Sequence, residues 1–195
     1  MSKYHLSSAL YHGPGRDGGD VGIIGALGGN AKTSNVLSLV VAPWSAVVGT
    51  RTVPPKLHAS KTTAAYMEAL ATEAGHVCGK CALLDPRVAK ALAVHACYVQ
   101  RNFQNAGQPA AICRASIGDP GPVFDVDTFL AMLAAARMSG VDHVRSCVAG
   151  DLGMVPEGIA KVLIDLVRLA GGFRWLGYTH QWYRSPWLRS THMAS

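Results

Sequence analysis

The stretch DVDTFLAMLAAARMSGVDHVRSCVAGDLGMVPEGIAKVLIDLVRLAGGFRWLGY, residues 125–178, decides the expected fold. Two segments with helical apolar spacing alternate with two β-rich segments. In order, these are a helix from Asp125 or Asp127 to Ser139, a strand over 141–148, a helix over 156–170 and a strand over 173–178. This order is typical of α/β proteins, so we predict a parallel sheet or a partial barrel with covering helices and a cysteine-rich insert.

Polar side chains follow both strands of this pattern. Asp151 comes soon after the first strand, and His180 comes just after the second. If one right-handed crossover joins two neighbouring parallel strands, both residues emerge at the same edge of the sheet. A carboxylate there can orient an imidazole or share a proton with it, so we predict Asp151 and His180 as catalytic, with Arg145 from the first strand. A turn cap for Asp151 and a structural hydrogen bond for His180 are the alternatives.

Upstream of this pattern lies a group of cysteines. Cys78 and Cys81 form a CxxC motif, and Cys97 supplies a third sulfur. Two cysteines at this spacing make a tight turn that directs both sulfurs to one point. We predict a metal-binding insert over residues 75–100, with these three cysteines as ligands, facing the polar edge of the sheet. A redox dithiol and inert buried cysteines are the alternatives.

The metal and its fourth ligand stay open, because cysteine ligands suit both zinc and iron–sulfur clusters. Cys113, Cys147, His76 and His95 are rivals for the fourth position. Three cysteine ligands would leave one iron of a cluster open to substrate. The chain has five cysteines, an odd number gathered around a CxxC motif, which favours a reducing compartment over a disulfide framework.

The first 29 residues form a glycine-rich N-terminal segment. Residues 25–33, GALGGNAKT, resemble a phosphate-binding loop, although the lysine stands two residues too far from the last glycine. Asn30, Lys32 and Thr33 are therefore the candidate residues for binding a nucleotide cofactor. The alternative is a flexible loop that ends in a turn at this asparagine.

Three more elements are expected before the CxxC motif. Residues 36–41 are rich in valine and leucine and predict a strand that ends near Pro43. Residues 46–48 are its expected hairpin partner or extension. A helix over 61–74, closed by Gly75, would then lead to the first cysteine of the motif.

The whole chain of 195 residues suits one domain, with 49% hydrophobic and 15% charged residues, as in compact globular proteins. Its formal net charge of +6 allows weak electrostatic contact with nucleic acid. The first residues lack the apolar core of a signal peptide, and no apolar run reaches the roughly 18 residues of a membrane span. We expect a cytoplasmic protein without a membrane partner.

Several motifs occur together in a recognisable order. They are Gly29-Asn30-Ala31-Lys32-Thr33, CxxC with a later Cys97-Tyr98-Val99, Val144-Arg145 before Gly150-Asp151, and Gly177-Tyr178-Thr179-His180-Gln181-Trp182. The set resembles a family of uncharacterised phage and bacterial proteins and, more distantly, is similar to the phage gene-product-eighty-eight family. The resemblance covers about residues 28 to 195 and implies a phage or mobile-element origin and a shared site, without naming a reaction. It also implies that relatives continue beyond Ser195 and have a shorter spacing between the second and third cysteines.

Three classes of function compete on these grounds. The first is an enzyme whose cysteines bind an iron–sulfur cluster opposite Arg145, Asp151 and His180. The second is a binding protein that zinc stabilises and that contacts nucleic acid through its basic surface. The third is a nucleotide-binding protein that uses Lys32 and Thr33.

Overall fold

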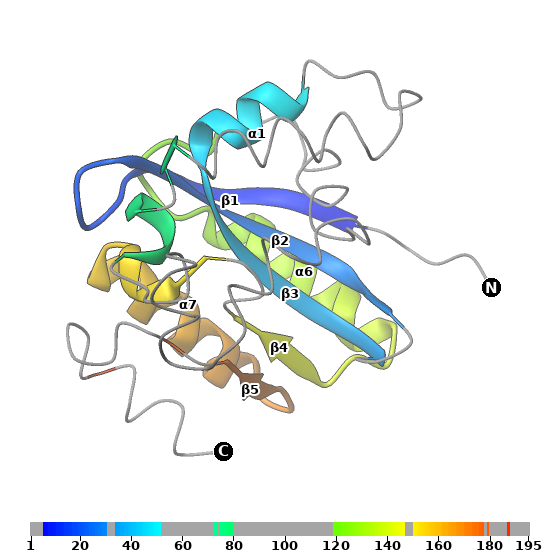
Figure 1. The fold of residues 1–195 in the computed structure, drawn as a ribbon. Helices are drawn as coiled ribbons and strands as arrows, with labels where there is room; N and C mark the ends of the chain where they lie inside the picture. Colours follow the sequence, from blue (N-terminus) through cyan, green and yellow to red (C-terminus); the bar gives the residue numbers. More distant parts are fainter. Residues whose placement is uncertain are drawn as a thin grey trace, which may run out of the picture.

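The computed structural model describes residues 6–30, 34–51, 72–73, 75–79, 119–146, 150–177, 179 and 187. Five strands form one sheet in the order β1-β2-β3-β4-β5 (Figure 1). The elements are β1 (Leu6–Pro14), β2 (Asp20–Asn30), β3 (Ser34–Pro43), α1 (Trp44–Arg51), α6 (Val126–Met138), β4 (His143–Arg145), the 3-10 helix η3 (Leu152–Met154), α7 (Glu157–Ala170) and β5 (Arg174–Leu176).

The sheet is mixed, and most of its pairing is antiparallel. β1 pairs with β2 and β2 with β3 in antiparallel fashion, whereas β4 lies parallel to β3 and β5 parallel to β4. The α/β class is therefore confirmed, but the prediction of a parallel sheet is wrong for the N-terminal half. That half was misjudged because β1 contains no β-branched residue, and because the glycines of β2, which are usually rare in strands, hid much of its length.

The glycine-rich segment is not a flexible loop. Residues 20–30 form β2, which pairs along its length with β1 on one side and β3 on the other. Its glycines allow close packing on both faces. A Cβ on Gly25 would lie 2.8 Å from the Met132 sulfur of α6, and a Cβ on Gly22 would lie 2.8 Å from the Trp44 ring of α1. Glycine is therefore selected here for the space it leaves between the sheet and its neighbours.

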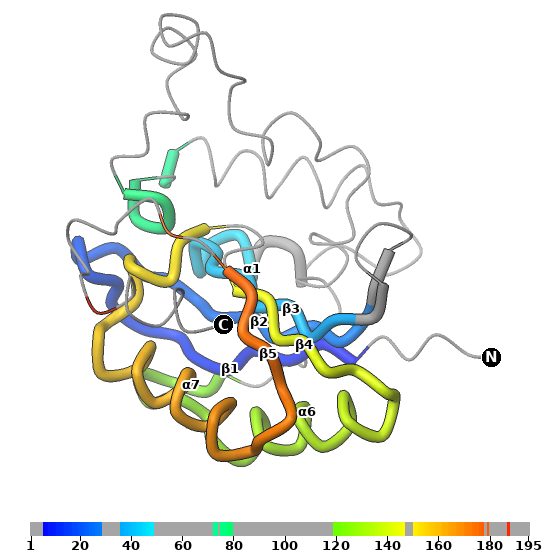
Figure 2. Tube along the Cα trace, turned by 90° about the horizontal axis from the view of Figure 1, so that it is seen from below, coloured from blue at the N-terminus to red at the C-terminus, as the bar shows by residue number. Residues whose placement is uncertain are grey.

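Two helices cover one face of the sheet, and α1 lies on the other. Figure 2 shows α6 and α7 side by side below the strands, with α1 on the opposite side. We call the two sides the α6 face and the α1 face. Residues 46–48, expected to pair as a strand, belong to α1, which begins directly after β3. The core side chains with the largest buried volume are Tyr11, Phe129, Leu10, Ile23, Ile24, Leu37, Leu39, Met132, Leu152 and Met154.

The C-terminal crossover unit follows the sequence prediction. Asp125 caps α6 by accepting a hydrogen bond from the Thr128 N–H at 2.9 Å, and α7 ends before Gly171, which has φ +64°. β4 and β5 are shorter than expected, with three residues each. They pair with each other in parallel, and α7 connects them in the sequence. The expected helix over 61–74 falls mostly outside the described residues. Residues 75–78 are helical, so the chain does not leave its helical conformation at Gly75.

The β1–β2 hairpin is closed by a buried tyrosine. The Tyr11 hydroxyl donates a hydrogen bond to the Pro14 carbonyl at 2.9 Å, and the register of β1 shifts by one residue just before Tyr11. Burial of the hydroxyl, with a smaller contribution from the Asp20 carboxylate, raises the pKa of Tyr11 above its usual value. Within the described parts of the chain, no helix is both long and apolar enough to cross a membrane.

Candidate functional site

The carboxyl ends of β4 and β5 meet at Asp151. This residue follows β4, is only 3% exposed, and caps η3 by accepting a hydrogen bond from the Gly153 N–H at 2.8 Å. The same carboxylate oxygen accepts a second hydrogen bond, at 2.7 Å, from the hydroxyl of Thr179, which follows β5. One buried carboxylate therefore ties the segment after β4 to the segment after β5.

A helical turn from a distant part of the chain reaches the same place. The Asp151 N–H donates to the Val77 carbonyl at 2.7 Å, and Val77 is fully buried. The next residue is Cys78, which is partly buried and packs against the core. We call Val77, Cys78, Asp151 and Thr179 the rim. The first cysteine of the CxxC motif thus lies beside the ends of two parallel strands, where α/β proteins bind ligands.

The chain turns sharply just after Cys78. Gly79 has φ +60°, and its N–H donates to the Gly75 carbonyl at 3.0 Å, so the helical conformation ends there. A positive φ at the residue after a helix is a common stop that reverses the chain direction. The first of the two residues that separate Cys78 from Cys81 therefore has a conformation that reverses the chain.

The β1–β2 turn contacts η3 and the helical turn that precedes Gly79. The Arg16 N–H donates to the Met154 carbonyl of η3 at 2.8 Å. Gly19 lies so close to the His76 ring that a Cβ at this position would clash with it. His76, one of the rivals for the fourth ligand, is therefore partly buried between the helical turn and the hairpin.

Arg145 is not brought next to Asp151. In the register of the sheet it is the partner of Ser38 in β3 and of Leu176 in β5. Its neighbour Val144 is fully buried on the α6 face, so Arg145 belongs to the α1 face. The structure places Arg145, partly buried, on one face of the five-stranded sheet.

Most of the other predicted site residues lie outside the described part of the chain, so their roles stay predictions. They are Cys81, Cys97, Cys113, Cys147, His95, His180, Lys32 and Thr33. Asn30 is the last residue of β2 and pairs with Ser34, the first residue of β3. Among the residues that are described, no three histidine, cysteine, aspartate or glutamate side chains gather as metal ligands.

Two residues of this region were not singled out from the sequence. Thr179 donates a hydrogen bond to Asp151, but in the motif of residues 177–182 only the adjacent His180 was predicted as a site residue. Ser146 follows β4 with 1% exposure, and its buried hydroxyl has no hydrogen-bond partner among the described residues. A small polar residue directly after a strand is the only signal that could have pointed to it.

Comparison of the chain with protein-family models, with curated proteins and with solved structures gives no match.

Proposed function

We propose that this chain is a metal-binding protein of phage or mobile-element type, in which Cys78, Cys81 and Cys97 hold an iron–sulfur cluster or zinc beside an active site at the strand ends. One observation carries the proposal: the hydrogen bond between the Asp151 N–H and the Val77 carbonyl. Through this bond the first cysteine of the motif borders the ends of β4 and β5. A metal held there would be next to polar groups, as a functional centre needs.

The local backbone supports the same proposal. The helical conformation ends at Cys78, and Gly79 reverses the chain with φ +60°. That reversal allows the sulfur of Cys81 to return toward the first sulfur. When bound, an iron–sulfur cluster with three cysteine ligands would supply one open iron, whereas zinc with four ligands would supply a structural link.

The residues of the chain would orient a ligand beside that centre. Asp151 fixes the loop after β4 through Gly153 and fixes the segment after β5 through Thr179. His180 follows Thr179 directly in the sequence, and Thr179 is anchored to Asp151 by its hydroxyl. We propose His180 as the proton-exchanging group and Asp151 as the residue that positions its segment.

Metal analysis of the anaerobically purified chain tests this proposal. Iron with acid-labile sulfide would indicate a cluster, and one equivalent of zinc per chain would indicate a structural site. Cys78→Ser should remove most of the metal and lower the melting temperature, because metal binding contributes on the order of 10 kcal/mol to folding in small sites. Lys80→Ala, a change inside the same turn at a residue that cannot ligate through sulfur, is the matched control and should keep its metal. A metal-free wild-type chain, or equal metal in both variants, would refute the proposal.

The second candidate is a nucleic-acid-binding protein that zinc stabilises. Its support is the placement of His143 and Arg145 on one face of the sheet, since they lie two residues apart in β4. Contacts with phosphates release counterions, so binding of a single-stranded oligonucleotide should be weak, independent of sequence and steeply weakened by salt. Absence of binding at low salt would remove this candidate without affecting the metal proposal.

A further inference from the structure

We propose that Arg145 and the hydroxyl of Ser38 form a binding site for a phosphate group on the α1 face of the sheet. The site is separate from the rim and does not rest on the metal proposal. It assigns a ligand to an arginine that the packing of the sheet leaves unexplained.

The register of the sheet places the two side chains next to each other. Ser38 of β3 and Arg145 of β4 are partners in the parallel pairing, so both project from the same face. Ala26 is the partner of Ser38 in β2, and it continues the same row across the sheet. Their sequence neighbours Leu37 and Val144 are fully buried on the α6 face, which fixes the orientation of the row.

The charge of Arg145 is the observation that calls for a ligand. Its side chain is partly buried, yet among the described residues no group accepts a hydrogen bond from its guanidinium. Arg137 shows the usual arrangement, because it donates to the Ala170 carbonyl at 3.0 Å and lies 5.4 Å from the ring centre of Phe173. Partial removal of a charge from water costs free energy unless an opposite charge or an acceptor compensates for it.

No acidic side chain of β4 or β5 offers that compensation. Asp142 stands just before β4, and its carboxylate is hydrogen-bonded to the imidazole of the adjacent His143. The other described strand residue with a carboxylate, Asp20, lies at the start of β2, beyond the rows that face Arg145. Among the described residues, the guanidinium of Arg145 therefore has no compensating acceptor, and we propose that a bound anion supplies one.

A phosphate group fits the donors. The planar guanidinium binds two oxygens of a phosphate at once, and a serine hydroxyl can donate to a third. Ala26 and Ser38, the neighbours of Arg145 in this row, both have small side chains and are partly exposed. A phosphorylated small molecule and a nucleic-acid backbone share this chemistry, and the experiment below separates them.

Inorganic phosphate is the first probe, titrated into the full chain at low ionic strength and followed by phosphorus NMR. Arg145→Gln should weaken phosphate binding about tenfold or more, because it removes charge-assisted hydrogen bonds. Arg145→Lys should restore only part of the affinity, since a point charge cannot bind two oxygens in the same fork. Ser38→Ala should cause a smaller loss. The metal content of all three variants should equal that of the wild type.

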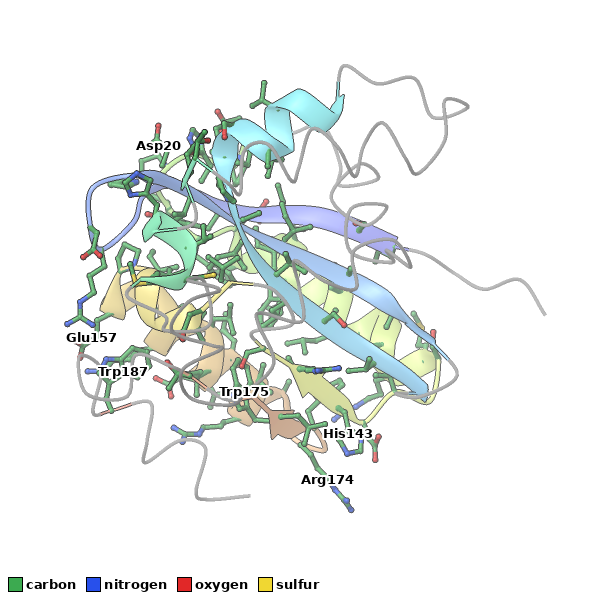
Figure 3. The ribbon with its side chains drawn as sticks, viewed as in Figure 1. Asp20, His143, Glu157, Arg174, Trp175 and Trp187 are labelled. Atoms are coloured by element: carbon green, nitrogen blue, oxygen red, sulfur yellow. The ribbon has the colours of Figure 1, made fainter. Side chains whose placement is uncertain are left out.

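Arg174→Gln is the matched control, because it removes the same charge one strand away. Arg174 is exposed and extends away from the sheet at β5 (Figure 3), so its loss should change phosphate binding less than about twofold. Equal losses in the Arg145 and Arg174 variants would show unspecific attraction and would overturn the proposal. Absence of phosphate binding to the wild type, with unchanged unfolding midpoints of the variants, would also overturn it.

A competition experiment identifies the source of the phosphate. In the first outcome, a single-stranded oligonucleotide displaces inorganic phosphate from the wild type, and its binding to Arg145→Gln falls to background. This outcome supports the site and identifies nucleic acid as its ligand. An oligonucleotide that leaves phosphate bound supports the site and identifies a phosphorylated small molecule. An oligonucleotide that binds the wild type and Arg145→Gln equally while displacing phosphate from the wild type would contradict the assignment to Arg145.

Discussion

At the scale of single residues, the carboxylate of Asp151 explains how three separate segments share one junction. The carboxylate accepts hydrogen bonds from the N–H of Gly153 and from the hydroxyl of Thr179. The backbone N–H of Asp151 donates a hydrogen bond to the carbonyl of Val77. The sequence identified Asp151 because it follows a strand. It could not identify Val77, because a backbone carbonyl has no residue-specific signal in a sequence.

The first prediction concerns the hydroxyl at this junction. Thr179→Val keeps the shape of the side chain but removes the donor to a carboxylate that is 3% exposed, so the free energy of unfolding should fall by about 1–3 kcal/mol. Thr179→Ser keeps the hydroxyl and should lose less. Urea unfolding of the two variants measures the difference. If valine is tolerated as well as serine, the hydrogen bond to Asp151 contributes nothing to stability.

A second residue-scale prediction concerns Gly150, which precedes Asp151. Gly150 has φ +70°, and a Cβ there would clash with the backbone carbonyl of Val41 in β3. Gly121 has φ +71° but nothing within 4 Å of an added Cβ, so Gly121→Ala should cost only about 1 kcal/mol of backbone strain. Gly150→Ala should cost that amount plus about 1–3 kcal/mol for the displaced strand. Equal unfolding free energies of the two variants would show that the loop after β4 can move away from β3.

At the scale of secondary-structure elements, the helices were easier to predict than the strands. α6 and α7 each combine an apolar stripe with a recognisable start and a glycine stop, and these signals lie within the element itself. β2 offered glycine where strands usually carry branched side chains, because its neighbours Met132 and Trp44 need the space. β4 and β5 have three residues each, and so short a strand is defined by its partners more than by its own sequence.

The start of α6 gives a prediction at this scale. The two Asp125 oxygens accept from the N–H of Thr128 at 2.9 Å and from its hydroxyl at 2.8 Å. Asp125→Ala should therefore lower the free energy of unfolding by about 1 kcal/mol or more. Asp127→Ala removes a carboxylate from the same turn that makes no hydrogen bond or ion pair among the described residues, so losing its interaction with the helix dipole should cost roughly 0.3–1 kcal/mol. Thermal unfolding of both variants decides whether the cap or the charge stabilises this end of the helix.

At the scale of the whole molecule, the direction of the N-terminal strands was the feature that could not be predicted from the sequence. The chain contains an antiparallel three-stranded part, β1 to β3, and a parallel part in which β4 and β5 follow β3. The crossover from β4 through α7 to β5 was predictable, because a helix between two strands favours parallel pairing. The pairing of β3 with β4 was not, since the residues between these strands give no rule for which edge β4 joins.

This division of the sheet predicts an order of stability that amide hydrogen exchange can measure. β2 pairs on both sides over most of its length, and its residues Val21, Ile23 and Ile24 are fully buried. β5 has three residues, pairs only with β4 among the described strands, and has Leu176 exposed at 43%. Because local opening requires fewer contacts to be broken in β5, its amides should exchange about tenfold faster than those of β2, or faster still.

β1 is the internal reference for that measurement, since it lies at the opposite end of the sheet. It also pairs on one side among the described strands, but over eight residue pairs, and its Leu10 and Tyr11 are almost fully buried. If position at the end of the sheet alone controlled opening, β1 and β5 would exchange alike. We expect the amides of β1 to exchange distinctly more slowly than those of β5, because opening β1 breaks more strand pairing and exposes more buried side chains. A β5 as protected as β2 would instead mean that the short parallel strands open only when the whole molecule unfolds.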